Sequence, residues 1–428
     1  MSKIAALLAE ANPAEARIMR HFADRAAGFR PSAVRDVFEV AMRPGIISLA
    51  GGNPDLDLLP LDTLGAMSAR IIEEEGLEVL QYGSGAGLEA LAELVCDFME
   101  SEGARPAVDD IQMTAGSQMG LDLATKLFVN PGDVILAEGP TYTGALGVFE
   151  GYQADVRQVP LDADGLDPAA VARAIEAIRA EGKQVKFLYT IPNFQNPTGI
   201  SLSDERRAEL VRVCREADVL IVEDNPYGQL SFTGERRRSL YSLDPENVLY
   251  LGSFSKVFSP GVRVGWMVAP FRVRKFLQIA GEAVTICPSV LSQRLVLGFM
   301  SEGLWESHTR ATAALYEARC KAVLDACEKY MPEGTTWTVP EGGFFTWLTL
   351  PAGGKYEDAT DALAPAIDAG VVFIPGSAFY EPVVGSDGVS RNPGANQLRI
   401  AFSAIEPDAL TEGVRRLAEV IGSEHASS

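Results

Sequence analysis

The stretch that decides the expected fold reads Gly252-Ser-Phe-Ser-Lys-Val-Phe-Ser-Pro-Gly-Val-Arg-Val-Gly265. It follows a short apolar run at 248–251, which predicts a buried strand. Lys256 lies there among aromatic and aliphatic neighbours, and burial favours the uncharged form of an amine. An uncharged lysine can form a Schiff base with an aldehyde. The sequence therefore predicts a strand whose end delivers one reactive amine.

The same loop offers groups that suit a phosphate dianion. Ser253 and Ser255 flank the lysine, and Arg263 follows seven residues after it. Two hydroxyls and a planar guanidinium bind phosphate well. An amine beside such a cup fits pyridoxal 5'-phosphate (PLP), which carries both an aldehyde and a phosphate. The alternative for these residues alone is an ordinary strand-to-loop junction with a solvated lysine.

Composition limits the classes of protein. The 428 residues are 47% hydrophobic, enough for two domains or one large and one small domain. The net charge of −21 argues against nucleic acid and anionic membranes as partners. Five cysteines without a CxxC pair and three scattered histidines argue against a disulfide framework and a metal site. With no apolar stretch of membrane-span length and no secretory signal, we expect a cytoplasmic protein.

Strands and helices alternate from residue 109 to about 270. Apolar runs that predict strands fall near 111–114, 134–137, 155–159, 185–190, 219–223, 248–251 and 264–268. Helical patterns fall near 117–128, 143–150, 168–181 and 203–217. The alternation predicts an α/β fold with a three-layer α/β/α large domain and a mostly parallel sheet.

The two ends of the chain have a different pattern. Towards the C-terminus we expect strands at 341–350, 371–374 and 397–402, helices at 357–368 and 406–422, and a loop at 381–396. This mixture predicts a small α+β domain. We therefore expect an N-terminal segment, 1–50, that packs with the small domain, a large PLP-binding domain over 51–304, and a small C-terminal domain over 305–428.

Other segments carry groups suited to the same cofactor. Ser117 and Gln118 open a predicted helix, whose free N–H groups attract an anion, although a plain N-cap is the alternative. Asp224 ends an apolar strand, where a carboxylate points into the usual ligand crevice and can keep the ring nitrogen of PLP protonated. Tyr227 follows three residues later and can bond to the ring hydroxyl.

Three further residues complete this set. Asn196 precedes a proline after another apolar strand, so its backbone is held extended and its amide can face the crevice. Tyr142 follows a strand and could stack on a flat cofactor. Arg399, on a strand of the small domain, has a planar guanidinium that can bind a carboxylate through two N–H groups. The alternative for Arg399 is a surface salt bridge.

These motifs stand in a distinctive order along the chain. They are GSQ at 116–118, Tyr142, NPTG at 196–199, EDNPY at 223–227, SFSK at 253–256, Arg263 and LRIAFS at 398–403. Together they resemble fold-type I PLP-dependent aminotransferases of class I/II. The likeness is to the 2-aminoadipate and kynurenine aminotransferase (LysN-like) branch, and it extends from Phe29 to about Val420.

The resemblance implies a role for each motif. Lys256 would carry PLP as a Schiff base and shuttle the proton, Asp224 would hold the ring nitrogen, and Tyr142 would stack on the ring. Asn196 and Tyr227 would bind the ring hydroxyl. The implied phosphate ligands are Ser117, Gln118, Ser253, Ser255 and Arg263.

The resemblance also implies partners and a substrate pocket. Tyr82 would reach the phosphate of a neighbouring subunit, which implies a homodimer. Gly52, Asn196 and Arg399 would hold the substrate α-carboxylate. Arg35 is the candidate for a distal carboxylate, with a solvated helix arginine as the alternative.

Three departures from the relatives bear on the side chain of the substrate. Met119 stands where a second Gln is usual, Asn53 where Leu is frequent, and Cys287 where His is frequent.

The function that follows is transfer of an amino group from an L-amino acid to a 2-oxo acid. The donor would be of the 2-aminoadipate, aromatic or kynurenine, or branched type, and the acceptor 2-oxoglutarate, with ping-pong kinetics. A PLP-dependent lyase, decarboxylase or racemase would use the same residues. A PLP-sensing regulator is the more distant alternative. It would need a DNA-binding segment, whereas about 45 residues precede the first predicted strand.

Overall fold

The computed structural model describes residues 11–29, 37, 39–385 and 387–422. Arg35, the candidate for a distal carboxylate, lies outside the described residues.

An eight-stranded sheet of order β2-β9-β8-β7-β6-β3-β4-β5 forms the centre of the larger unit. In chain order its strands are β2 (Ile111–Thr114), β3 (Val134–Gly139), β4 (Asp155–Asp162), β5 (Gly165–Leu166), β6 (Val185–Thr190), β7 (Leu220–Asp224), β8 (Val248–Ser253) and β9 (Gly265–Val268). The five strands from β8 to β4 run parallel. β9 is antiparallel to both β2 and β8, and β5 is antiparallel to β4. The mostly parallel sheet predicted from the sequence is confirmed.

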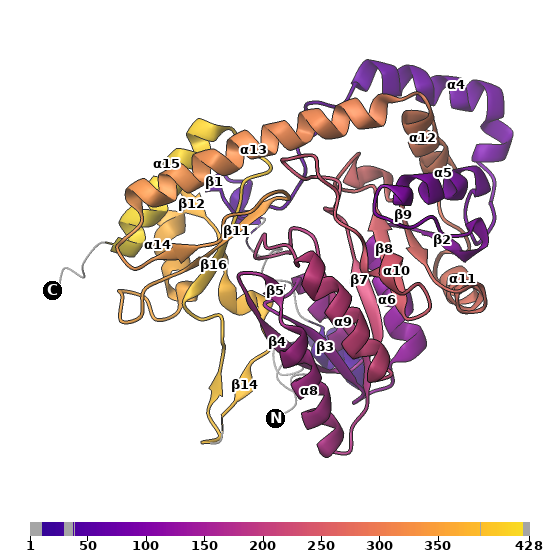
Figure 1. Ribbon diagram of the computed structural model, residues 1–428. Helices are drawn as coiled ribbons and strands as arrows, with labels where there is room; N and C mark the ends of the chain where they lie inside the picture. The colour runs from indigo at the N-terminus through magenta and orange to yellow at the C-terminus, as the bar shows by residue number, and fades with distance from the viewer. Residues whose placement is uncertain (1–10, 30–36, 38, 386, 423–428) are drawn as a thin grey trace.

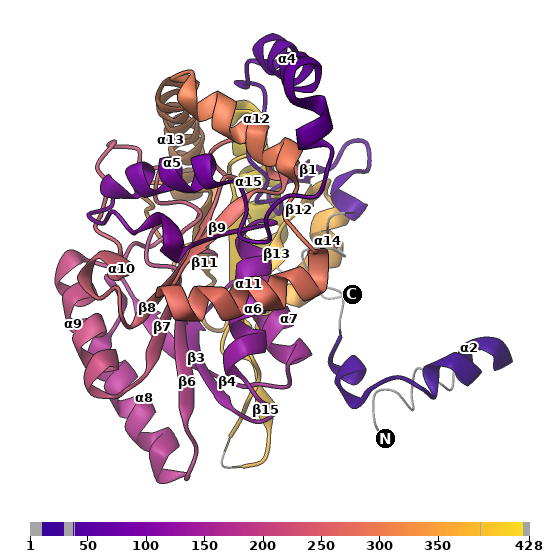
Figure 2. The same ribbon diagram turned by 90° about the vertical axis from the view of Figure 1, so that its right-hand side faces the viewer.

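Helices cover both faces of this sheet. The helices of the larger unit are α4 (Leu61–Val79), α5 (Glu89–Glu100), α6 (Ser117–Phe128), α7 (Thr143–Gly151), α8 (Pro168–Ala180), α9 (Asp204–Glu216), α10 (Leu240–Leu243), α11 (Phe271–Thr285) and α12 (Val290–Ser301). α8 and α9 lie on one face and α6, α7 and α11 on the other (Figures 1 and 2). Because both faces are covered, strands such as β3 are buried along their whole length.

A smaller unit is built on a second sheet. Its antiparallel order is β10-β11-β16-β13, with β10 (Thr336–Trp337), β11 (Phe345–Thr349), β13 (Ile374–Pro375) and β16 (Gln397–Ala401). α13 (Leu304–Tyr330), α14 (Leu363–Asp368) and α15 (Pro407–Gly422) accompany it, and α13 runs along the top of both units in Figure 1. β1 (Ile47–Ser48) pairs in parallel with β12 (Val371–Val372), so the chain before the large sheet contacts the small unit. The domain boundaries given above stay a prediction.

The structure corrects two expectations in this smaller unit. The segment expected to be a loop at 381–396 contains a hairpin of β14 (Val383–Val384) and β15 (Ser390–Arg391). Its turn is held by Asp387, which accepts from the Val389 N–H at 3.0 Å and pairs with Arg391 at 2.6 Å. Asp-Gly is a strong hairpin signal that the expectation of a loop overlooked.

The helix expected at 357–368 is interrupted. Residues Ala359–Ala362 form a 3-10 turn, and α14 starts only at Leu363. Pro365 is the reason, because a proline fits the first turn of an α-helix and disrupts its interior.

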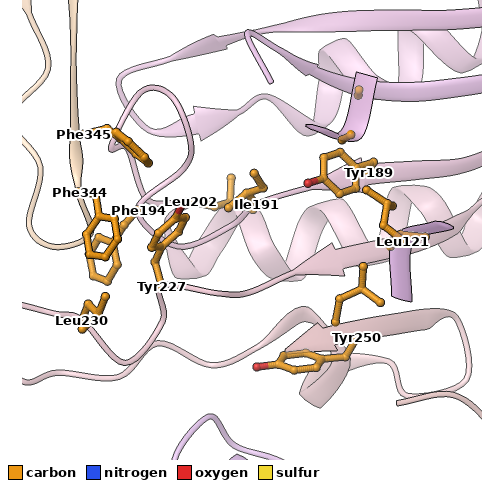
Figure 3. Packing of buried hydrophobic residues seen from close by; sticks show 14 of the residues in the cluster. Leu121, Tyr189, Ile191, Phe194, Leu202, Tyr227, Leu230, Tyr250, Phe344 and Phe345 are labelled. Carbon is orange, nitrogen blue, oxygen red and sulfur yellow. The ribbon is translucent and has the colours of Figure 1, made fainter. Parts of the chain in front are cut away.

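Aromatic side chains pack where the two sheets meet. The Tyr227 ring lies 5.3 Å from Phe344 and 5.9 Å from Phe345, measured between ring centroids. Figure 3 shows these three rings beside Phe194 at the end of the large sheet. The contact fixes β11 against the loop after β7, and a cavity lies beside it.

No helix among the described residues combines the length and the apolar composition of a membrane span. In the same residues, no group of three His, Cys, Asp or Glu side chains could hold a metal ion.

Candidate active site

A cavity of about 310 Å³ opens at the carboxyl edge of the large sheet, against the small sheet. The predicted site residues that line it are Gly52, Ser117, Gln118, Tyr142, Asn196, Asp224, Tyr227, Ser253, Ser255, Lys256, Arg263 and Arg399. Most follow strands of the large sheet, because parallel strands end at one edge. Tyr82 does not line it; that side chain is 72% exposed elsewhere on the surface.

The Lys256 amine lines the cavity. Its Nζ donates to the Gly52 carbonyl at 3.0 Å. Burial lowers the pKa of Lys256 to about 8, and the charges of Arg399 and Arg263 act in the same direction. A fraction of the amine is therefore uncharged near neutral pH, as attack on an aldehyde requires.

One end of the cavity has the chemistry of an anion site. Arg263 adopts a left-handed φ of 52°, and its Nη2 donates to the Ala115 carbonyl at 2.7 Å. Its Nη1 lies 3.4 Å from the Ser255 hydroxyl. This approach needs Gly116, since a Cβ there would stand 2.5 Å from the guanidinium.

No described side chain caps the helix that begins at this end. The N-cap residue of α6 is Gly116, which has no side chain, and Ser117 and Gln118 of the first turn line the cavity. Free N–H groups, hydroxyls and a guanidinium together fit a phosphate dianion.

The Asp224 carboxyl also lines the cavity and is buried at the end of β7. Tyr189 donates to its Oδ2 at 2.8 Å. Burial raises the pKa of Asp224 to about 6, although the Tyr189 hydrogen bond, the Ser117 hydroxyl and the Lys256 charge lower it. Oδ1 is buried and meets no hydrogen-bond partner among the described residues. A buried carboxylate oxygen without a donor fits the protonated ring nitrogen of PLP.

Arg399 reaches the cavity from the small sheet. It is 3% exposed, and no acidic side chain of the described residues lies within 4 Å, so the alternative of a surface salt bridge is excluded. Its guanidinium donates to Asn196 Oδ1 at 2.9 Å and to the Ala50 carbonyl at 2.6 Å. Burial lowers the pKa of Arg399 to about 10. A buried guanidinium without a counter-ion is suited to receive a carboxylate.

Two residues that the sequence did not indicate shape this site. Tyr189 holds Asp224, and Phe345 lies under Arg399 with the guanidinium carbon 4.3 Å from the ring centroid. Phe345 also explains Gly52, since a Cβ at residue 52 would stand 2.6 Å from that ring. In sequence both aromatics look like core residues of apolar strands, so no local signal separates them from the core.

Comparison with known proteins agrees with this geometry. Residues 44–417 match the family described as aminotransferase class I and II. The chain is similar to aromatic-amino-acid aminotransferase 1 of Thermococcus litoralis, with 36% identity over 95% of both chains. It is also similar to 2-aminoadipate transaminase of Thermus thermophilus, with 34% identity over 94% of this chain and 96% of the other.

A solved structure is similar over the same extent. It is kynurenine aminotransferase of Pyrococcus horikoshii, in complex with PMP and with kynurenine as substrate, at 36% identity and a TM-score of 0.87. The match covers 94% of this chain and 97% of that one.

Proposed function

Since the chain belongs to the class I and II aminotransferases and is a PLP-dependent aminotransferase, we propose that it is specific for an aromatic, kynurenine or 2-aminoadipate type of L-amino acid. The acceptor would be a 2-oxo acid such as 2-oxoglutarate, with ping-pong kinetics. The observation that carries the transfer of an amino group is one cavity with the Lys256 amine, the free Asp224 oxygen and a buried Arg399. The names of the similar proteins support these donor types.

Asp224 and Lys256 have different roles in the proposed reaction. When bound, PLP supplies an aldehyde that takes up the amino group and a ring that stabilises negative charge on the donor's α-carbon. Asp224 Oδ1 would hold a proton on the ring nitrogen, which requires the ionised carboxylate. Lys256 Nζ would take the proton from the α-carbon of the donor. It would return that proton to the carbon that had been the aldehyde carbon of PLP.

The two ends of the cavity position the reactants. Arg263 and the first turn of α6 bind the phosphate, with the Ser253 and Ser255 hydroxyls. Arg399 and Asn196 hold the donor carboxylate. Asn196 also bonds to the ring hydroxyl together with Tyr227, and Tyr142 stacks on the ring. Burial raises the pKa of Tyr227, so its hydroxyl stays protonated as a hydrogen-bond donor at neutral pH.

We further propose a homodimer in which Tyr82 completes the neighbouring site. Tyr82 lies next to α4, and apolar side chains are exposed on α4 and on α11, which faces the viewer in Figure 2. These side chains include Leu61, Ile72, Leu77 and Leu80 on or after α4, and Phe276, Ile279 and Val284 on α11. Exposed apolar patches of this kind mark interfaces.

Mixing two inactive variants tests the dimer. In a hybrid of Lys256→Ala with Tyr82→Ala, one site has both a wild-type lysine and a wild-type neighbouring tyrosine. Activity should recover to about a quarter of wild type, because half of the dimers are hybrids with one good site. No recovery in a mixture shown to exchange subunits would contradict the proposal.

All described cysteines are free thiols, which supports a cytoplasmic location that cell fractionation can test. Arg35 lies outside the described residues, and its role toward a distal carboxylate stays a prediction.

The reaction itself is tested without an acceptor. Addition of an amino donor alone should convert bound PLP to pyridoxamine phosphate in one turnover, followed by absorbance. A lyase, decarboxylase or racemase would regenerate PLP and leave the spectrum unchanged. A panel of donors with 2-oxoglutarate, repeated on Arg35→Ala, then identifies the side chain that is preferred.

A further inference from the structure

A second buried carboxyl lies behind the cavity and has no part in the chemistry above. Glu138, near the end of β3, is 3% exposed. Its Oε1 accepts from the Thr190 hydroxyl at 2.5 Å, and both oxygens accept from the Ile191 N–H at 3.2 Å. Its Oε2 accepts from Gln195 Nε2 at 3.0 Å. Among the described residues, no cation lies within 4 Å of this carboxyl.

Gln195 extends these contacts to two loops of the cavity. Its Nε2 also donates to the Pro140 carbonyl at 2.8 Å, two residues before Tyr142. Its Oε1 accepts from the Thr198 N–H at 2.9 Å and from the Thr198 hydroxyl at 2.7 Å. One amide therefore links the loop of Tyr142 to the loop that contains Asn196.

The direction of these hydrogen bonds is set by groups that can only donate or only accept. The main-chain N–H of Ile191 can only donate, so the carboxyl must accept there. The Pro140 carbonyl and the carboxylate accept from Gln195 Nε2, and the Thr198 N–H donates to Oε1, so the three together fix which end of the amide is the donor. A neutral amide in place of the carboxyl would set an N–H against one of these donors.

A buried carboxylate without a counter-ion is costly, which argues against a purely stabilising role. Burial raises the pKa of Glu138 to about 7, and Asp224 acts in the same direction. Glu223 on β7 is a natural comparison, because it is fully buried and burial raises its pKa to the same value. Glu223 accepts from the N–H groups of Leu240 and Tyr241 in α10, which belong to no loop of the cavity.

We propose that Glu138 is a positioning residue that, through Gln195, holds Tyr142 and Asn196 at the separation that the cofactor ring requires. The inference rests on the proposed function, since it takes both residues as ring contacts. It assigns the carboxyl a role in binding and tuning PLP without contact to it.

The test compares two isosteric variants, Glu138→Gln and its matched control Glu223→Gln. Binding of PLP to the apo-protein is followed by quenching of tryptophan fluorescence. The dissociation constant of PLP should rise roughly 10-fold or more in Glu138→Gln, as it does when a residue that orients the direct ligands of a bound group is changed. Glu223→Gln should lower thermal stability while keeping the dissociation constant within about twofold.

A second readout separates positioning from loss of stability. The pH midpoint of the absorbance change of bound PLP depends on the group at its ring hydroxyl, which is Asn196 in the proposed site. That midpoint should move in Glu138→Gln and stay in Glu223→Gln. Equal midpoints and equal affinities in the two variants would overturn the proposal.

A milder variant covers the case in which Glu138→Gln does not fold. Thr198→Val removes one donor to Gln195 and keeps the shape of the side chain. It should weaken PLP binding by about 2- to 5-fold and move the midpoint in the same direction. Wild-type values in Thr198→Val would refute the proposal, whereas a wild-type protein that does not bind PLP would refute the proposed function instead.

Discussion

The two walls of the cavity are held in place in different ways. On the large-sheet wall, Asp224 is bonded by Tyr189 from the adjacent parallel strand, so both partners belong to one sheet. On the small-sheet wall, the Arg399 guanidinium donates hydrogen bonds to residues outside its sheet, Asn196 and Ala50. Asp224 is thus held within one sheet, while the position of Arg399 depends on how the two sheets meet.

This difference predicts whether a substitution affects cofactor binding or donor binding. A change on the large-sheet wall should affect the cofactor and every donor alike. A change on the small-sheet wall should affect donor binding and leave the cofactor in place.

Removal of the amine should have the largest effect. Lys256→Ala should lower turnover by at least about 10⁴-fold with every donor, because the imine-forming group and the proton carrier are lost together. Steady-state assays across the donor panel measure this. Near-normal turnover in the variant would refute the assignment of Lys256.

A change on the opposite wall should be smaller and more selective. Arg399→Lys should lower kcat/KM by about 10- to 100-fold, mainly through KM, because a lysine cannot form the planar fork around a carboxylate. PLP affinity, measured by fluorescence, should stay at its wild-type value. An equal loss of PLP affinity would remove the distinction between the two walls.

The lowered pKa of Lys256 predicts a pH dependence for the uptake of PLP. The uncharged amine is the nucleophile, so the rate should rise with pH and level off above the pKa of about 8. That value predicts a rise of about tenfold between pH 7 and pH 9 in stopped-flow absorbance. A rate that keeps rising through pH 10 would show that the lysine titrates as it does in water.

The smallest effect should come from the layer behind the large-sheet wall. Tyr189→Phe removes a hydrogen bond that lowers the pKa of Asp224, so this pKa should rise above about 6. Turnover should fall by about 2- to 10-fold on the acid side of the pH–rate profile, where more Asp224 is protonated. Tyr250→Phe is the control, because its hydroxyl is equally buried but donates to Glu102. The same acid-side loss in both variants would contradict the role of Tyr189.

Several features could be predicted from the sequence because they depend on local patterns. Lys256, Asp224 and Asn196 each follow an apolar run, and parallel strands bring their ends to one edge. The prediction of a loop at 381–396 was wrong for a local reason too, since its Asp-Gly turn was overlooked.

Other features depend on contacts between distant segments. Tyr189 and Phe345 look like core residues in sequence, and only the register of neighbouring strands places them at the cavity. Glu138 looks like a strand-end acid, and its partner Gln195 is 57 residues away. The exposure of the Tyr82 side chain likewise could not be predicted from the residues around it.

The sequence by itself determined the order of the elements and which residues could carry the chemistry, because hydrophobic periodicity and the nature of each side chain are local properties. Only the tertiary structure decided which carboxyl oxygen stays without a donor, which arginine is buried without a counter-ion and which glycine allows a ring to approach. Those properties arise from desolvation and from contacts between chain segments far apart in the sequence, and neither exists until the two sheets pack together.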